Sequence, residues 1–150
     1  MPAYIGETRQ SSTIDSGLDP EGKYFLKFRF TGHGLPPHQN RLNQMHWGQR
    51  LEEKKKWRER VALITIGHRP KEPVKIAVLT LTRGSTTSPD SDGLVGSFKM
   101  IIDALVYLKV LEDDNFKHIK MPDYRWEKTK NNSFNFIEVQ VVERAQDGPA

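Results

Sequence analysis

The sequence contains no cysteine among its 150 residues. Disulfide bonds and metal sites built from thiolate ligands are therefore excluded. It also lacks a long apolar run, whereas a membrane-spanning helix needs about 20 apolar residues. The N-terminus does not have the basic segment and following apolar segment of a secretory signal. We therefore expect a cytoplasmic protein that does not contact a membrane.

Acidic residues are fewer than basic ones. The chain has 23 Lys and Arg against 19 Asp and Glu, a formal net charge of +4 and a pI of about 9.3. This excess of positive charge favours an anionic partner such as nucleic acid, although many basic proteins bind none. The length is typical of one domain and suffices to bury a core without cross-links.

Several segments have the residue pattern of β-strands. Apolar and polar residues alternate at residues 23–30 and 134–142, and residues 74–83 are rich in β-branched side chains. A weaker strand pattern lies within residues 115–129. Pro122 interrupts it, which indicates a strand at the edge of a sheet.

Helix patterns occupy residues 51–66 and about 91–109, while Gly, Pro and Asn make residues 31–50 a predicted long loop. The resulting order, β-α-β-α-β-β, predicts an α+β fold: a single domain with a small mixed β-sheet and helices packed on it. We predict a flexible N-terminal arm at residues 1–22, the folded domain at residues 23–143 and a flexible C-terminal tail at residues 144–150.

The second predicted helix has two different faces. Because a helix turns about 100° per residue, its apolar residues form one stripe that faces the core. A polar stripe lies nearly opposite, where Gly96 allows close approach of a ligand. The apolar stripe consists of Leu94, Phe98, Ile101, Leu105 and Leu108, and the polar stripe of Asp92, Gly96, Lys99 and Asp103.

Acidic residues gather at both ends of this helix. Asp90 and Asp92 lie at its start, and Glu112, Asp113 and Asp114 follow its end. One interpretation is an aspartate that caps the helix, with the acidic triplet in a solvated turn. However, one cap needs only one aspartate, and three adjacent negative charges repel one another unless a cation or solvent compensates them. The other interpretation is a metal site.

Carboxylate oxygens are the ligands that Mg²⁺ prefers. Two carboxylates from one loop and one or two from the other can hold one or two such ions, which can activate water at a phosphodiester. Lys99, on the same face as Asp92, can contact the substrate phosphate. An HExxH zinc motif is absent, and the glycine of "DSDGL" comes too early for a calcium-binding loop.

Read together, "DSDGLVGSFKMIIDAL" and "LEDD" resemble the RusA family of Holliday-junction resolvases, including its phage-borne relatives. An upstream Pro-Pro-x-x-Asn segment followed by a basic helix is also similar, so the resemblance covers roughly residues 24–142. Gly93 departs from the family pattern, which usually has Asn there, and this removes an amide that orients a ligand or caps the helix. Asp90 and Asp92 match the first acidic pair, Lys99 the lysine, Asp103 the helix aspartate, and Asp113 and Asp114 the terminal pair.

The resemblance implies a homodimer that uses Mg²⁺ to nick four-way DNA junctions in recombination and repair. Ligands that are all oxygen also allow Mn²⁺ to replace Mg²⁺. The predicted metal ligands are Asp90, Asp92, Asp113 and Asp114, and the predicted catalytic residues are Asp90, Asp92, Lys99 and Asp114.

Basic residues upstream are candidates for DNA contacts, each adding an attraction to phosphate that weakens with salt. For the basic residues on the predicted helix, the alternative interpretation is that they form a solvated face together with Glu52, Glu53 and Glu59. Trp47 and Trp57 are expected in the core rather than stacked on bases. The predicted DNA contacts are Asn40, Arg41, Lys54, Lys55 and Arg58.

Three functions remain open from the sequence. The first is a metal-dependent endonuclease that acts on branched DNA. The second is a non-catalytic, basic nucleic-acid-binding module whose acids cap helices, and the third is a domain that binds only other proteins. Dependence on metal separates the first from the others, and salt-sensitive DNA binding separates the second from the third.

Overall fold

The computed structural model describes residues 10–32, 34–37, 39–115, 117–120 and 122–145, apart from the side chains of residues 39 and 40. Its β-strands form one mixed five-stranded sheet in the order β1-β2-β5-β3-β4. Neighbouring strands are antiparallel, except that β3 and β4 are parallel. The strands are β1 (Ser11–Leu18), β2 (Tyr24–Thr31), β3 (Ala77–Ser85), β4 (Asp123–Lys128) and β5 (Phe136–Glu143).

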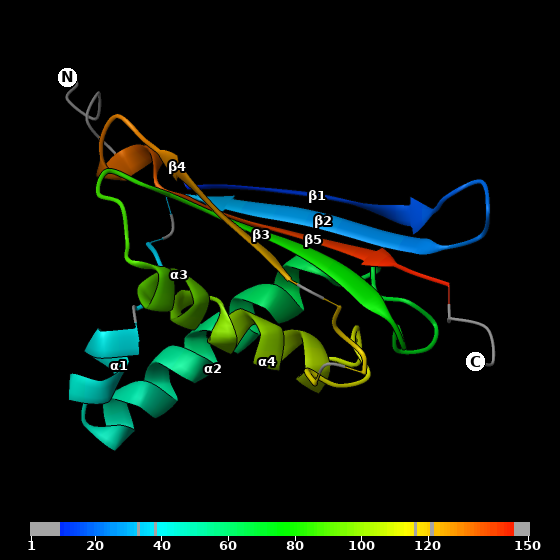
Figure 1. The fold of residues 1–150 in the computed structure, drawn as a ribbon, viewed down its shortest axis with the longest axis horizontal. Helices are drawn as coiled ribbons and strands as arrows, with labels where there is room; N and C mark the ends of the chain where they lie inside the picture. Colours follow the sequence, from blue (N-terminus) through cyan, green and yellow to red (C-terminus); the bar gives the residue numbers. More distant parts are fainter. Residues whose placement is uncertain (1–9, 33, 38, 116, 121, 146–150) are drawn as a thin grey trace.

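The main helices form a second layer on one face of the sheet (Figure 1). The helix α2 packs against α4, and the short helix α1 packs against α3. This arrangement confirms the predicted α+β domain with a mixed sheet and helices packed on it. The helices are α1 (Gln39–Gln44), α2 (Trp47–Ile64), α3 (Ser91–Ser97), α4 (Lys99–Tyr107) and the 3₁₀ helix η2 (Asn132–Phe134).

The core lies between these two layers. Strand β2 buries the predicted face, with Leu26 and Phe28 fully inaccessible to solvent, and the predicted face of β5 is buried as well. From the helices, Trp57 and Ile101 are fully buried. Trp47, in contrast, is 67% exposed, so the expectation that it lies in the core was wrong. Among the described residues, no helix has both the length and the apolar character required to cross a bilayer.

The predicted order of elements lacked β1. Ser11–Leu18 lie within the expected N-terminal arm but pair with β2 along its whole length, so the order is β-β-α-β-α-β-β. The strand has only weak apolar alternation, and Ile14 is its one side chain packed against the core. Backbone hydrogen bonds to β2 at the edge of the sheet therefore hold this strand in place. Such pairing leaves little hydrophobic pattern in the sequence.

The helices also differ from their predicted bounds. The predicted loop of residues 31–50 contains α1 and the first turn of α2, where the His46 ring accepts a hydrogen bond from the backbone N–H of Gly48. The predicted helix of residues 91–109 is divided at Phe98 into α3 and α4. Phe98 is fully buried, and its backbone N–H donates to the carbonyl of Val95.

Strand β4 lies at the edge of the sheet, as Pro122 indicated. Its parallel pairing with β3 runs from Thr80–Asp123 to Ser85–Lys128. The chain between α4 and β4 is attached to the segment before β3 by backbone hydrogen bonds in both directions between Val74 and residues 110–112. These hydrogen bonds place the acidic triplet, residues 112–114, near the end of the sheet at which β4 begins.

Candidate active site

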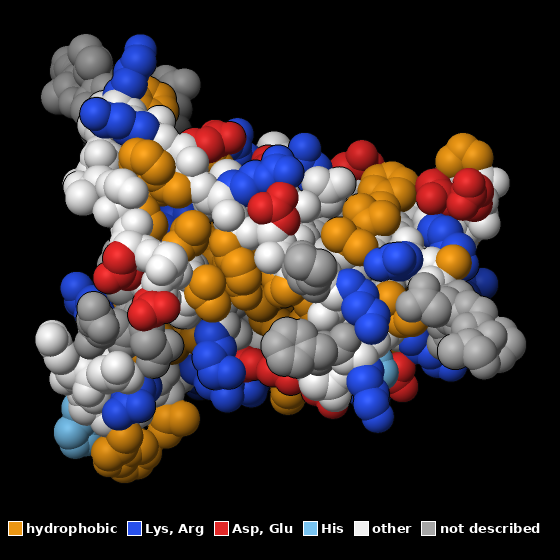
Figure 2. All heavy atoms as spheres, in the orientation of Figure 1, with side chains coloured by type: hydrophobic (Ala, Val, Ile, Leu, Met, Phe, Trp, Pro, Cys, Tyr) orange, Lys and Arg blue, Asp and Glu red, His pale blue; other side chains and the backbone are white. Residues whose placement is uncertain are grey.

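A cavity of about 620 Å³ lies between α3, α4 and the start of β4. Its lining contains three carboxylates and one ammonium group, from Asp92, Asp103, Asp114 and Lys99. Gly96, which is buried, contributes a wall without a side chain. In Figure 2, hydrophobic side chains are uncovered at the centre of this face, between the sheet and the helices, and acidic side chains lie at their lower border. The complete lining is Asn43, Asp92, Val95, Gly96, Lys99, Ile102, Asp103, Asp114, Ile119, Pro122 and Tyr124.

The division at Phe98 sets the directions of these side chains. Asp92 lies in the first turn of α3, whereas Lys99 and Asp103 lie one turn apart on α4. The Phe98 ring, 6.0 Å from the ring of Tyr124 between centroids, fixes this junction against β4. The predicted polar stripe therefore faces one cavity, although the helix that carries it is not continuous.

Asp114 reaches the cavity from a different part of the chain. Leu111 is buried, and the backbone N–H of Glu112 donates to the carbonyl of Val74 at 3.0 Å. These contacts fix the loop in which Asp114 lies, close to Ile119 and Pro122. The cavity thus combines acids from both ends of the predicted helix, as the metal-site interpretation requires.

The cavity carboxylates make no direct polar contact in the part of the chain that the structure describes. None of Asp92, Asp103 and Asp114 forms a side-chain hydrogen bond or an ion pair there. Lys99 and Asp103 have the spacing of a helical ion pair but do not form one. The oxygen atoms of the three carboxylates are therefore available as ligands for a cation.

The donor set fits some metals and not others. Within the described residues, no three His, Asp or Glu side chains lie close enough together to hold one ion, so the protein alone does not form a closed metal cage. Mg²⁺ does not need one, because it commonly binds one or two carboxylates, several waters and a substrate phosphate. Asp92, Asp103 and Asp114 supply oxygen donors of this kind around one space, and their chemistry fits Mg²⁺ or Mn²⁺.

Asp90 and Asp113 do not line the cavity, although both were predicted as metal ligands. Asp90 is the N-cap of α3, and its Oδ1 accepts a hydrogen bond of 2.6 Å from the backbone N–H of Gly93. Asp113 accepts a hydrogen bond of 2.7 Å from the backbone N–H of Asp114 and one of 3.2 Å from the Asn115 amide. Their observed contacts are those of the capping interpretation, and their role as metal ligands stays a prediction.

The predicted DNA contacts are spread over several surfaces. Lys54 reaches a second cavity beside the carboxylates, whereas Arg41 and Lys55 are exposed elsewhere. The guanidinium of Arg58 lies over the ring of Tyr107, 3.9 Å from its centroid. Asn40 belongs to α1, but its side chain is outside the described residues.

The cavity also contains two polar side chains that the sequence did not assign to the metal site, Asn43 and Tyr124. Asn43 lies on α1, in a segment that was predicted as a loop, and Tyr124 is on the weakest predicted strand. Burial raises the pKa of the Tyr124 hydroxyl above its ordinary value, so Tyr124 is a neutral group beside the carboxylates at neutral pH. Residue spacing alone contained no signal for either residue, because both reach the cavity only through tertiary packing.

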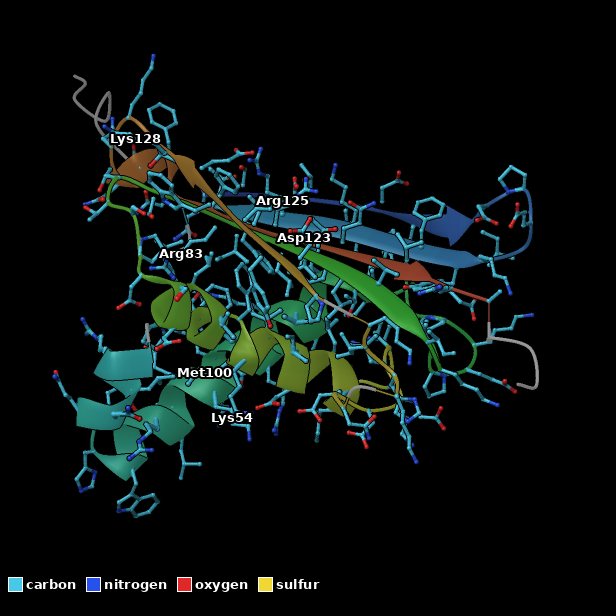
Figure 3. All side chains as sticks on the ribbon, viewed as in Figure 1. Lys54, Arg83, Met100, Asp123, Arg125 and Lys128 are labelled. Carbon is cyan, nitrogen blue, oxygen red and sulfur yellow. The ribbon has the colours of Figure 1, made fainter. Side chains whose placement is uncertain are left out.

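Arg83 holds the chain that leads into α1. It is 5% exposed, and its Nη1 donates a hydrogen bond of 3.0 Å to the carbonyl of Pro36 (Figure 3). Burial lowers the pKa of the Arg83 guanidinium to about 10. This contact links β3 to the Pro36–Pro37 segment before α1, the helix that carries Asn43 to the cavity.

The chain was also compared with known proteins. No protein-family model matches it, and no curated protein matches it.

Proposed function

We propose that the protein is an endonuclease that uses Mg²⁺ or Mn²⁺ to hydrolyse phosphodiester bonds in branched DNA, with four-way junctions as its substrate. The observation that carries the proposal is the cavity lined by Asp92, Asp103 and Asp114, whose carboxylates form no hydrogen bond or ion pair among the described residues. A site for phosphodiester hydrolysis needs oxygen donors for a cation together with a group that attracts phosphate. Lys99 is that group, since it lines the same cavity.

Each residue has a specific role in this proposal. Asp92 and Asp114, from α3 and from the loop after α4, would hold the cation, which would attract the scissile phosphate to the cavity. Asp103 contributes negative charge one helical turn from Lys99. The ammonium of Lys99 donates to a phosphate oxygen and stabilises the negative charge that develops as water attacks phosphorus and the P–O bond to the leaving oxygen breaks. The bound metal ion supplies a more acidic water and electrostatic stabilisation of the leaving oxygen.

The resemblance to RusA-type resolvases supports branched DNA as the substrate. The motif residues that carry this resemblance and also line the cavity are Asp92, Lys99, Asp103 and Asp114. Basic residues on α2 beside the cavity supply an attraction to phosphate that does not depend on sequence. We further propose that the protein acts as a homodimer in the cytoplasm.

A second function is a nucleic-acid-binding module without catalysis. It is favoured by the helix-capping contact of Asp90, by the local turn contacts of Asp113, and by the lack of a three-carboxylate group among the described residues. Such a module binds DNA with or without metal, because its affinity comes from Lys and Arg.

A cleavage assay decides between the two. Purified protein is incubated with a labelled synthetic four-way junction, with Mg²⁺ or with EDTA, and nicks are resolved on a denaturing gel. We expect nicking only with Mg²⁺ or Mn²⁺. Asp92→Asn should lower the rate by at least about 100-fold yet bind the junction as tightly, because removing a negative charge does not weaken attraction to phosphate. Cleavage by Asp92→Asn near the wild-type rate, or full activity in EDTA, contradicts the metal site.

A further inference from the structure

A second cavity, of about 460 Å³, adjoins the carboxylate cavity and shares Lys99 and Asp103 with it. We call it the tryptophan groove. Figure 3 labels Lys54 and Met100, which lie close together between α2 and α4 in that view. The groove is lined by Leu42, Trp47, Arg50, Leu51, Lys54, Lys99, Met100 and Asp103.

The apolar side of this groove extends the buried stripe of α2 beyond the core. Trp57 and Val61 on that helix are fully buried against the sheet and α4. Trp47 and Leu51 continue the stripe toward the start of the helix, where they are 67% and 54% exposed. In Figure 1 the first turns of α2 lie beside α1 at the lower left, away from the sheet, so the sheet does not cover them. The exposed indole therefore lies beside the proposed active site.

The groove also contains positive charge. Arg50 and Lys54 follow Trp47 on α2, at one and two turns from it, and both line the groove. Arg50 forms a long hydrogen bond of 3.4 Å from its Nε to the carbonyl of Met45, and its terminal nitrogens have no partner among the described residues. Lys54 has no hydrogen-bond or ion-pair partner among the residues that the structure describes.

We infer that the tryptophan groove binds an unpaired nucleotide of the DNA strand. This nucleotide is adjacent to the phosphate that binds in the carboxylate cavity. The base stacks on Trp47, with Leu42, Leu51 and Met100 forming the apolar surface around it. Arg50 and Lys54 contact the flanking phosphates. An aromatic ring with two cations one helical turn apart complements a nucleotide, which has one flat apolar face and one anionic group.

This inference rests on the proposed function and identifies which part of a branched DNA the protein recognises. At a four-way junction the strands exchange between duplexes, and a base at the exchange point can leave its stack at lower cost than a base inside a duplex. A site for such a base makes cleavage depend on branching and not on sequence, since every base has a face that can stack.

Binding of a single-stranded probe tests the inference without cleavage. A labelled 12-residue oligothymidylate is titrated in EDTA, with a blunt 12-base-pair duplex as comparison. We expect Trp47→Ala to weaken oligothymidylate binding about fivefold or more and Trp47→Phe to retain most of it. Leu63→Ala is the matched control, because Leu63 is an equally exposed apolar residue (71%) of α2 outside the groove.

The cationic side chains of the groove are tested in the same binding assay. Lys54→Ala should weaken binding and reduce its salt dependence, whereas Lys128→Ala, which removes an exposed lysine of β4 outside the groove, should change binding less. Equal affinities of Trp47→Ala and Leu63→Ala, or no binding of oligothymidylate by the wild type at 100 µM, overturn the inference. Circular dichroism confirms that each variant is folded.

These outcomes are separate from those of the cleavage assay. If the protein nicks junctions with Mg²⁺ but Trp47→Ala binds oligothymidylate as tightly as the wild type, the proposed function stands and the inference about the tryptophan groove is overturned. A protein that never nicks yet depends on Trp47 for oligothymidylate binding is a nucleic-acid-binding module that uses this groove. Binding of a protein partner through Trp47, without binding of either DNA probe, overturns the inference.

Discussion

Asp90 and Asp92 are two residues apart, yet their carboxylates have different surroundings. Asp90 accepts a hydrogen bond from the Gly93 backbone and starts α3, while Asp92 faces the cavity with no partner among the described residues. A sequence in which both acids precede one helix does not distinguish these two roles. Substitutions do distinguish them, because a cap and a metal ligand need different properties of the side chain.

Asp90 is predicted to act as a positioning residue through its cap. Asparagine caps a helix about as well as aspartate, so Asp90→Asn should leave both the stability and the cleavage rate nearly unchanged. Asp90→Ala removes the cap and should lower the free energy of unfolding by about 1 kcal/mol. Urea unfolding and junction cleavage measure the two effects. Loss of cleavage in the stable Asp90→Asn variant would instead identify Asp90 as a metal ligand.

Lys99 is predicted to contact the scissile phosphate. Its side chain is exposed, lines both cavities and forms no ion pair with Asp103 in the described structure. Lys99→Ala should therefore fold normally and lose about tenfold or more in single-turnover cleavage rate, about 1.4 kcal/mol of transition-state stabilisation. Lys128→Ala is the control, since that exposed lysine lines neither cavity. A wild-type rate for Lys99→Ala would limit Lys99 to surface charge.

At the scale of elements, strands β3 and β5 make a close contact between Gly84 and Phe136. Gly84 pairs with Phe136, whose ring lies over the glycine, and the guanidinium of Arg29 lies 3.7 Å from the centre of that ring. A Cβ built on Gly84 would be 2.1 Å from Cε1 of Phe136. Glycine at this position therefore makes room for the aromatic ring that covers it.

Gly84→Ala is predicted to lower the free energy of unfolding by about 1–3 kcal/mol, because the buried ring of Phe136 must move. The effect should be much smaller in a Phe136→Leu background, which removes the ring that the new methyl group contacts. A double-mutant cycle by urea unfolding measures this coupling. Additive costs in the two backgrounds would show that strand propensity, rather than the ring, explains the effect.

At the scale of the whole molecule, the proposed function allows one nick per chain, because the described residues form one carboxylate cavity. Resolution of a four-way junction needs two nicks on opposing strands, related by the two-fold symmetry of the substrate. A C₂ homodimer supplies two cavities with that symmetry, and such dimers are the commonest oligomers. We therefore predict a dimer in solution at micromolar concentration.

Mixed dimers test this prediction. Wild-type chains are unfolded and refolded together with Asp92→Asn chains, and the products are assayed on a junction in a small supercoiled plasmid. Heterodimers should nick one strand and leave the plasmid open-circular, whereas wild-type dimers should linearise it. Sedimentation gives the oligomeric state independently. Paired cuts by a strictly monomeric protein would exclude this arrangement.

Much of the fold followed from the sequence, because burial leaves a periodic pattern. The alternation in β2 and β5 predicted their buried faces, and the spacing of Phe98, Ile101 and Leu105 predicted the core stripe correctly. The pattern failed for β1, an edge strand whose pairing uses the backbone and buries little apolar surface. It also failed for the division of the helix at Phe98, since both halves continue the same stripe.

The candidate site was determined in part by the sequence and in part by tertiary packing. The sequence by itself determined that Lys99 and Asp103 share one face of α4, because helical geometry fixes the directions of residues four apart, whereas the direction of Asp92 on α3 also depends on the turn at Phe98. Only the tertiary structure brought Asp114 and Tyr124 to that face, through contacts between distant segments. Only the tertiary structure assigned Asp90 to a helix cap and left Trp47 exposed beside the cavity, because burial and hydrogen bonding depend on which elements cover a residue.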